Sequence, residues 1–217
     1  MTDFAAARQA MVDCQVRPSD VTRYAIIEAM LCAPRELFVP KARRDIAYAE
    51  CEIPLSEGRV LMAPRTIAKM LEAAGVREGD LVLDLAPGTG YTTAVLSKLS
   101  AAVVAVDTGE DTVGQMQSLL AELEADNALV TDGDPAAGDP AHGPYDVIFV
   151  NGGVETVPQA LLDQLKDGGR LVAIFMNGAA GQCRVLVRAG QSCSERYAFD
   201  ATAQVLAGFE AKAEFAF

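Results

Sequence analysis

Two glycines and two carboxylates lie where a short strand is expected to pass into a helix. Asp84 belongs to the apolar stretch LVLDLA, and Gly88 and Gly90 follow it in the turn APGTG. A backbone without a Cβ lets a ligand approach closely, and the helix that follows offers free N–H groups and the positive end of its dipole. Asp107 ends the next apolar stretch, AAVVAVD, where its carboxylate can accept hydrogen bonds from both hydroxyls of a ribose. This combination predicts a nucleotide or nucleoside site.

Two common phosphate-binding patterns do not fit this turn. A P-loop needs Gly-Lys-Ser/Thr after the turn, and no such triplet follows Gly90. The dinucleotide pattern GxGxxG needs a third glycine where this chain has Thr93. A nucleoside cofactor without a pyrophosphate does not need that glycine, so S-adenosylmethionine is the predicted cofactor. For the glycine pair by itself, a tight turn without a ligand is the alternative.

The elements that must position these residues follow from the pattern after Asp80. Short apolar stretches alternate with helical ones, which is typical of βαβ units in a mostly parallel sheet buried on both faces. The expected strands are 81–86, 101–107, 127–132, 145–152 and 170–175, and the expected helices are 91–100, 112–125 and 157–169. The tail stretches 183–190, 195–201 and 212–217 alternate between apolar and polar residues, which predicts antiparallel or edge strands.

The segment before the sheet is expected to be helical and then irregular. Helices are predicted over 4–15 and 19–33, with Ser19 as the N-cap of the second, and residues 40–63 are predicted to be irregular. Pro64 suits the first turn of a further helix that ends at Gly75. We therefore expect an α/β fold, a doubly wound Rossmann-like sheet with an N-terminal helical cap and antiparallel C-terminal strands.

Composition narrows the class of protein. The chain has 217 residues, of which 51% are hydrophobic and 22% charged, which is typical of a globular protein. A net charge of −12 disfavours nucleic acid as a partner, because binding it depends on clustered Lys and Arg. No apolar run approaches the ~20 residues of a membrane span. Five scattered cysteines and the lack of a secretory signal predict free thiols and a cytoplasmic protein, and the single His142 is too isolated for a metal site.

Several stretches together resemble the protein-L-isoaspartate O-methyltransferase family of S-adenosylmethionine-dependent enzymes. They run from the N-terminus to about residue 175 and include PRELFVP, AYAECEIPL, VLDLAPGTGYTTAVLSKL and VPQALLDQLKDGGRLV. The resemblance implies a methyltransferase that repairs damaged proteins or peptides by methylating the carboxylate of isoaspartyl residues. It also implies a single domain over 1–217, in which residues 1–63 form the helical cap and acceptor-side loop and 64–217 form the Rossmann-like core.

The resemblance assigns roles to the residues around the turn. It places the two glycines and Tyr91 along the methionine and ribose part of the cofactor, Asp107 on the ribose hydroxyls, and Gly133 with Asp134 beside the adenine. Ala86 stands where the family's turn usually begins with glycine, and its methyl group is small enough for the cofactor to fit. The implied cofactor-binding set is Asp84, Ala86, Gly88, Thr89, Gly90, Tyr91, Asp107, Thr108, Gly133 and Asp134.

The acceptor side departs further from the family. The family carries Gly-Gln-Thr-Ile-Ser-x-Pro, and this chain has GRVLMAP, so Arg59, Val60 and Met62 replace the Gln, the Thr and the Ser. Met62 cannot supply the hydrogen bonds of a serine at this catalytic position. The guanidinium of Arg59 could instead hold an acceptor carboxylate in a bidentate pair. The alternative is an arginine that faces solvent.

The expected chemistry tolerates such a loss in part. A carboxylate acceptor is ionised at neutral pH and needs no general base, so proximity and alignment can supply most of the acceleration. We therefore expect near-normal cofactor affinity with weak or altered isoaspartyl activity. Two alternatives remain open: a methyltransferase with a different acceptor, such as a small carboxylate, and a non-catalytic module that binds S-adenosylmethionine or another nucleoside. Neither nucleic acid nor a membrane is an expected partner.

Overall fold

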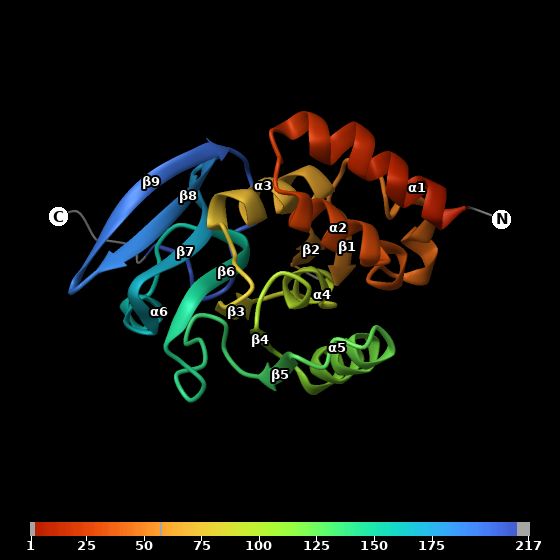
Figure 1. Ribbon diagram of the computed structural model, residues 1–217. Coiled ribbons are helices and arrows are strands. Elements are labelled where there is room, and N and C mark those ends of the chain that lie inside the picture. Colours follow the sequence, from red (N-terminus) through yellow and green to blue (C-terminus); the bar gives the residue numbers. More distant parts are fainter. Residues whose placement is uncertain (1–2, 57, 212–217) are drawn as a thin grey trace.

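A seven-stranded sheet forms the centre of the protein, whose computed structural model describes residues 3–56 and 58–211. The strands lie in the order β5-β4-β3-β6-β7-β8-β9, as Figure 1 shows. The first five run parallel, β8 pairs antiparallel with β7, and β9 pairs antiparallel with β8. The strands are β3 (Leu81–Leu85), β4 (Ala102–Asp107), β5 (Ala128–Asp132), β6 (Tyr145–Val154), β7 (Leu165–Asn177), β8 (Ala180–Ala189) and β9 (Ser192–Asp200). The predicted α/β fold with antiparallel C-terminal strands is confirmed.

Within the described residues, the remaining elements are six α-helices, a two-stranded hairpin and short helical turns. The helices are α1 (Phe4–Met11), α2 (Tyr24–Cys32), α3 (Pro64–Ala74), α4 (Tyr91–Ser97), α5 (Glu110–Glu122) and α6 (Gln159–Asp163). The antiparallel hairpin consists of β1 (Ile53–Ser56) and β2 (Arg59–Leu61). A π-helical turn (Val12–Val16) and 3-10 turns (Arg17–Ser19, Arg35–Leu37 and Lys41–Ile46) complete the N-terminal part.

The two faces of the sheet are covered differently. On one face, side chains of α2, α3, α4 and α5 pack with the sheet into one apolar cluster, and the N-terminal helices join it beside α3 (Figure 1). On the other face, α6 and the non-helical segment 201–211 supply the cover, with Leu161, Leu206 and Phe209 buried against the strands. The C-terminal segment therefore does part of the packing that a helix does in a doubly wound fold.

The second predicted helix begins later than the sequence indicates. Ser19 is not its N-cap, because the Ser19 hydroxyl donates to the carbonyl of Gln15 at 2.6 Å and ends the preceding helical turn. Asp20 then takes a left-handed backbone conformation with φ of 62°. As a result α2 starts at Tyr24 rather than at residue 19.

The predicted helix over 157–169 is also wrong in length. The α-helix ends at Asp163, and β7 begins at Leu165. Arg188 of β8 explains the early end, because its guanidinium donates to the carbonyls of Leu162, Asp163 and Leu165. A residue distant in sequence thus satisfies the last carbonyls of the helix.

The segment expected to be irregular, 40–63, contains the 3-10 turn Lys41–Ile46 and the β1–β2 hairpin. The helix after it matches the prediction: Pro64 is its first residue, and Gly75 follows it in the left-handed conformation and donates to the Leu71 carbonyl. The expected strand at 212–217 lies outside the described residues.

Candidate functional site

A cavity of about 560 Å³ lies over the carboxyl end of β3. The chain order reverses there, because β3 has β4 on one side and β6 on the other. Ligands of open α/β sheets bind at this kind of crevice, and the volume is within the usual range of ligand pockets. Of the predicted site residues, the cavity is lined by Arg59, Ala86, Gly88, Thr89, Asp107, Thr108 and Asp134.

Asp107 is the buried carboxylate of this cavity. It is the last residue of β4, and its side chain is only 2% exposed. Its Oδ2 accepts from the Gly88 backbone N–H at 2.7 Å and from Arg59 Nη2 at 2.5 Å, and its Oδ1 accepts from the Thr108 N–H at 2.8 Å. The carboxylate therefore ties the glycine turn, the start of the next loop and the β1–β2 hairpin to one point.

The two glycines of the turn serve different purposes. Gly88 has φ of +63°, and a Cβ there would lie 2.7 Å from Leu55 Cδ1, so the hairpin lies directly above it. Gly90 has φ of +92°, and a Cβ there would lie 2.5 Å from Met116 Cγ of α5. Gly90 is not among the residues that line the cavity. Its positive φ and its packing against α5 both favour a glycine at position 90.

Ala86 occupies a backbone conformation that favours glycine. Its φ is 57°, and its N–H donates to the Val106 carbonyl at 2.9 Å, which fixes the conformation. A left-handed conformation costs a residue with a Cβ ~1–2 kcal/mol, whereas the greater freedom of an unfolded glycine costs ~0.4–1 kcal/mol.

Ala86→Gly is therefore expected to raise the free energy of unfolding by up to about 1.5 kcal/mol, as measured by urea denaturation. The matched control is Ala68→Gly in α3, a buried alanine in a regular helix. The control should lose about 1 kcal/mol or more, because glycine is a poor helix former. Equal losses in both variants would contradict strain at Ala86.

Asp84 lies beneath the turn rather than in the cavity wall. It is fully buried, and its carboxylate accepts from Thr92 Oγ1 at 3.0 Å, Thr93 Oγ1 at 2.7 Å and Asn151 Nδ2 at 2.6 Å. Asn151 also donates to the Leu85 carbonyl at 2.9 Å. This network joins β3, α4 and β6, and so positions the turn. Sequence analysis missed Asn151, although a polar residue at the end of the apolar stretch YDVIFVNG was a visible signal.

Burial raises the pKa of Asp84 to about 7, against the effect of its three hydrogen-bond donors. Because the folded state then holds the proton more tightly than the unfolded state does, Asp84 lowers the free energy of unfolding as pH rises from about 4 to about 7.

We expect the unfolding free energy of the wild-type protein to fall relative to that of Asp84→Asn between pH 5 and pH 7.5. Asp146→Asn is the control, because Lys166 and the Leu81 N–H lower the pKa of Asp146 and keep it ionised across this range. Its difference from wild type should stay constant. A constant difference for Asp84→Asn as well would contradict the raised pKa.

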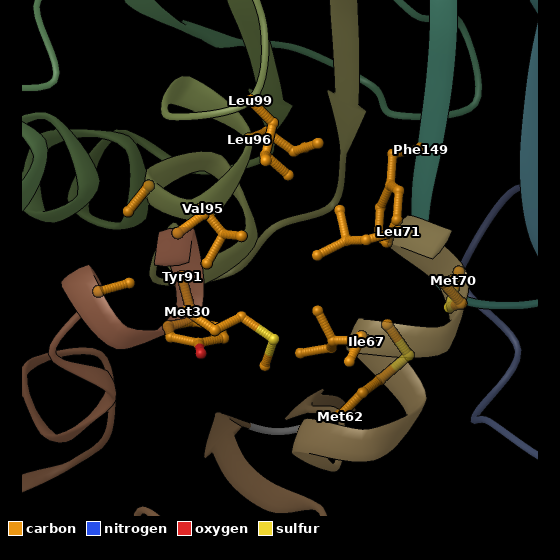
Figure 2. Close-up of a cluster of buried hydrophobic side chains, with 14 of the residues drawn as sticks. Met30, Met62, Ile67, Met70, Leu71, Tyr91, Val95, Leu96, Leu99 and Phe149 are labelled. Atoms are coloured by element: carbon orange, nitrogen blue, oxygen red, sulfur yellow. The ribbon is translucent and has the colours of Figure 1, made fainter. Parts of the chain in front are cut away.

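Tyr91 and Met62 are buried outside the cavity lining. The Tyr91 ring packs edge-on against Phe38 with centroids 5.6 Å apart, and the Arg35 guanidinium lies 4.9 Å from its centre. The Met62 side chain is 2% exposed and lies in an apolar cluster with Met30 and Ile67, which Figure 2 shows. Gly133 is also absent from the lining, and its N–H donates to the Asp107 carbonyl.

The acceptor-side loop is held from below by a buried arginine. Arg35 is 0% exposed, and it donates from Nε to the Ala47 carbonyl and from Nη2 to the Met62 carbonyl, both at 2.7 Å. Met62 thus contributes a backbone carbonyl and an apolar anchor to the loop. Arg59, three residues earlier, reaches the cavity and is 23% exposed, so the alternative of a solvent-facing arginine is wrong.

A segment that sequence analysis did not assign to the site forms one wall of the cavity. It follows β9 and contributes Gln204, Val205, Leu206, Ala207 and Glu210 to the lining. Backbone hydrogen bonds from Gly153 to Gln204 and from Leu206 to Gly153 attach it to β6. The signal in the sequence was weak, because only scattered apolar residues follow the last strand.

Other predicted features lie away from the cavity. His142 is exposed and contacts Asp139, with 2.9 Å between Nδ1 and Oδ2. The five cysteines are unpaired in the structure. Within residues 3–56 and 58–211, no helix is both long and apolar enough to cross a membrane.

Comparison with known proteins identifies the family. The family model for protein-L-isoaspartate(D-aspartate) O-methyltransferase matches residues 6–200. The chain is similar to the protein-L-isoaspartate O-methyltransferases of Synechococcus, at 40% identity over 78% of this chain and 69% of the relative, and of Roseiflexus castenholzii, at 36% identity over 86% and 84%.

Solved structures share the fold. One protein-L-isoaspartate O-methyltransferase structure superimposes with a TM-score of 0.80 at 24% identity, and covers 94% of this chain and 67% of that chain. A second, from Plasmodium falciparum in complex with S-adenosyl-L-homocysteine, has a TM-score of 0.78 at 17% identity and covers 96% and 100%. With the match of the family model over most of its length, the chain belongs to the protein-L-isoaspartate(D-aspartate) O-methyltransferase family.

Proposed function

We propose that this protein transfers the methyl group of S-adenosylmethionine to the carboxylate of isoaspartyl residues in proteins or peptides. One observation carries the proposal beyond family membership. The buried carboxylate of Asp107 and the Gly88 turn share a single cavity with Arg59 of the acceptor-side hairpin. A nucleoside and a carboxylate can therefore meet within one pocket.

The cofactor end of the cavity is assigned to residues on β4 and the turn. Asp107 accepts the ribose hydroxyls, and Gly88 allows the ligand to approach the backbone. Asp134 also lines this cavity, and its carboxylate suits an adenine amino group; its Oδ1 accepts from the Ala136 N–H at 2.9 Å. The donor set and the volume fit a nucleoside without a pyrophosphate. The bound cofactor supplies an electrophilic methyl group on a sulfonium.

The protein contributes position rather than proton transfer. The acceptor carboxylate is already ionised at neutral pH, so alignment of its oxygen with the methyl group supplies most of the acceleration. Arg59 places a cationic side chain in the cavity lining, and its guanidinium can orient a carboxylate through two hydrogen bonds. Leu55 and Leu206 add apolar surface that limits water around the reacting atoms.

We expect this protein to turn over isoaspartyl peptides more slowly than a relative that has the family's hydroxyls on the acceptor side. Position 62 presents a methionine to the core and no hydroxyl to the cavity. Each missing hydrogen bond to a charged group is worth ~1.5–3 kcal/mol. A small carboxylate is the second candidate acceptor, favoured by the placement of Arg59.

The test is labelled-methyl incorporation into three acceptors: an isoaspartyl peptide, its aspartyl twin and a small-molecule fraction from a cell lysate. Incorporation into the isoaspartyl peptide with none into the twin supports the proposal. Incorporation into the small-molecule fraction alone identifies the second candidate. Binding of S-adenosylhomocysteine without turnover on any acceptor would contradict the proposal and indicate a non-catalytic binding module.

We also place the protein in the cytoplasm. The support is the set of five unpaired cysteines, four of which are exposed. Exposed thiols persist in a reducing compartment.

A further inference from the structure

The contact between Arg59 and Asp107 joins the two halves of the cavity. Arg59 begins β2, on the acceptor-side hairpin, and Asp107 ends β4, on the cofactor side. Their side chains meet at 2.5 Å, and the two are 23% and 2% exposed. The cation proposed for the acceptor is thus held by the anion proposed for the ribose.

The hydrogen-bonding capacity of Asp107 makes this contact incompatible with a fully bound ribose. A carboxylate offers about four acceptor positions. Three are used by the Gly88 N–H, the Thr108 N–H and Arg59. Two ribose hydroxyls need two positions, so one existing donor has to leave. The two N–H groups are fixed by the backbone, whereas Arg59 is held only by its long side chain.

The displaced guanidinium remains on the hairpin that covers the cavity. Leu55 on β1 lies against the Gly88 turn, which keeps the hairpin in place. Gln204 of the C-terminal segment lies beside the same hairpin, because a Cβ on Gly58 would be 3.7 Å from its Nε2. Arg59 and Gln204 both line the cavity, so together they present amide and guanidinium donors to a carboxylate.

We propose that Arg59 couples the two ligands: cofactor binding transfers it from Asp107 to the acceptor carboxylate, which it holds together with Gln204. This inference rests on the proposed function and adds an order to it. Without cofactor, Asp107 neutralises Arg59, and an incoming carboxylate meets a competing anion. With cofactor bound, a partly buried cation lacks a partner, and the carboxylate supplies one. By linkage, the acceptor must tighten cofactor binding by the same factor.

The test is calorimetric titration of S-adenosylhomocysteine into the full-length protein, with and without a saturating isoaspartyl peptide. S-adenosylhomocysteine lacks the sulfonium charge, so any coupling comes from the protein rather than from attraction between the two ligands. In the wild-type protein, the peptide should lower the Kd of S-adenosylhomocysteine at least about fivefold, the lower end of typical couplings.

Two variants assign the coupling to residues. Arg59→Gln should bind S-adenosylhomocysteine at least as tightly as the wild type, because a competitor for Asp107 is gone, and the peptide should no longer change its Kd. Gln204→Ala should show reduced coupling, because one of the two donors to the acceptor carboxylate is gone. The matched control is Arg65→Gln, an arginine outside the cavity that pairs with Glu50, and it should keep the full coupling.

Three results would overturn the inference: no coupling in a wild-type protein that does methylate the peptide, coupling that persists in Arg59→Gln, or weaker S-adenosylhomocysteine binding in Arg59→Gln alone. Failure of the proposed function gives a different pattern. The coupling would then be present while the peptide remains unmethylated in the presence of S-adenosylmethionine.

Discussion

Gly88→Val is expected to abolish detectable binding of S-adenosylhomocysteine. A Cβ at this position would lie 2.7 Å from Leu55 Cδ1, and φ of +63° is a conformation that a β-branched residue rarely adopts. To relieve both problems, the turn must move, and the Gly88 N–H must leave Asp107 Oδ2. The turn then no longer supports the ligand, and the Asp107 carboxylate loses the hydrogen bond that orients it. Calorimetric titration measures the effect, with circular dichroism to confirm that the variant folds.

A milder variant and a control complete this test. Asp107→Ala removes a charged acceptor and should weaken binding by about 10- to 150-fold, the equivalent of ~1.5–3 kcal/mol. Gly79→Ala is the control, because nothing lies within 4 Å of a Cβ there. It should bind like the wild type. Near-normal affinity in a folded Gly88→Val protein would show that the ligand does not approach this turn.

Met62→Ser is expected to lower the free energy of unfolding by about 3–5 kcal/mol. The Met62 side chain is buried among Met30, Ile67 and Met70, as Figure 2 shows. Shortening a buried methionine costs ~2–5 kcal/mol, and a buried hydroxyl without a partner adds to the cost. That loss is a large part of the 5–15 kcal/mol that stabilises a typical domain. Urea denaturation measures it.

This outcome bears directly on the acceptor side. From the sequence alone, a serine at position 62 would be expected to restore an acceptor contact. In the structure, Val60→Thr is the matched control for stability, because Val60 is partly exposed and water can reach the added hydroxyl. It should cost much less than Met62→Ser, because it leaves no fully buried hydroxyl without a partner. A Met62→Ser protein as stable as the wild type, with raised turnover, would mean that the side chain at position 62 faces the acceptor.

Features set by local chemistry could be predicted from the sequence. The turn after β3 was visible because an apolar strand, two glycines and a helix follow one another. Pro64 and Gly75 marked the ends of α3 for the same reason, since one suits a first turn and the other a left-handed end.

Features set by distant residues could not be predicted. The end of α6 depends on Arg188, which binds its last carbonyls from another strand. The start of α2 depends on Ser19, which bonds backwards to Gln15 instead of capping forwards. In both cases, a hydrogen bond to a distant or preceding residue changes the helix boundary that the local sequence pattern predicts.

The candidate site likewise contains residues that local sequence patterns predict and residues that only tertiary contacts bring together. Asp107 and Gly88 were assigned from strand ends and glycine spacing, and the structure places both in the cavity. The ion pair between Arg59 and Asp107 joins residues on different sheets, so the spacing of residues in the sequence did not predict it. The cavity wall formed by Gln204 and its neighbours could not be predicted either, because these residues reach the cavity only where segment 201–211 crosses the end of β6.

Labelled-methyl transfer from S-adenosylmethionine to an isoaspartyl peptide tests the proposed function most directly. The assay compares the wild-type protein with Asp107→Ala, both at a cofactor concentration below the wild-type KM. We expect incorporation by the wild type into the isoaspartyl peptide and not into its aspartyl twin, with a rate about 10- to 150-fold lower for Asp107→Ala. Equal rates for the two proteins, or no incorporation by a wild-type protein that binds S-adenosylhomocysteine, would contradict the proposed function.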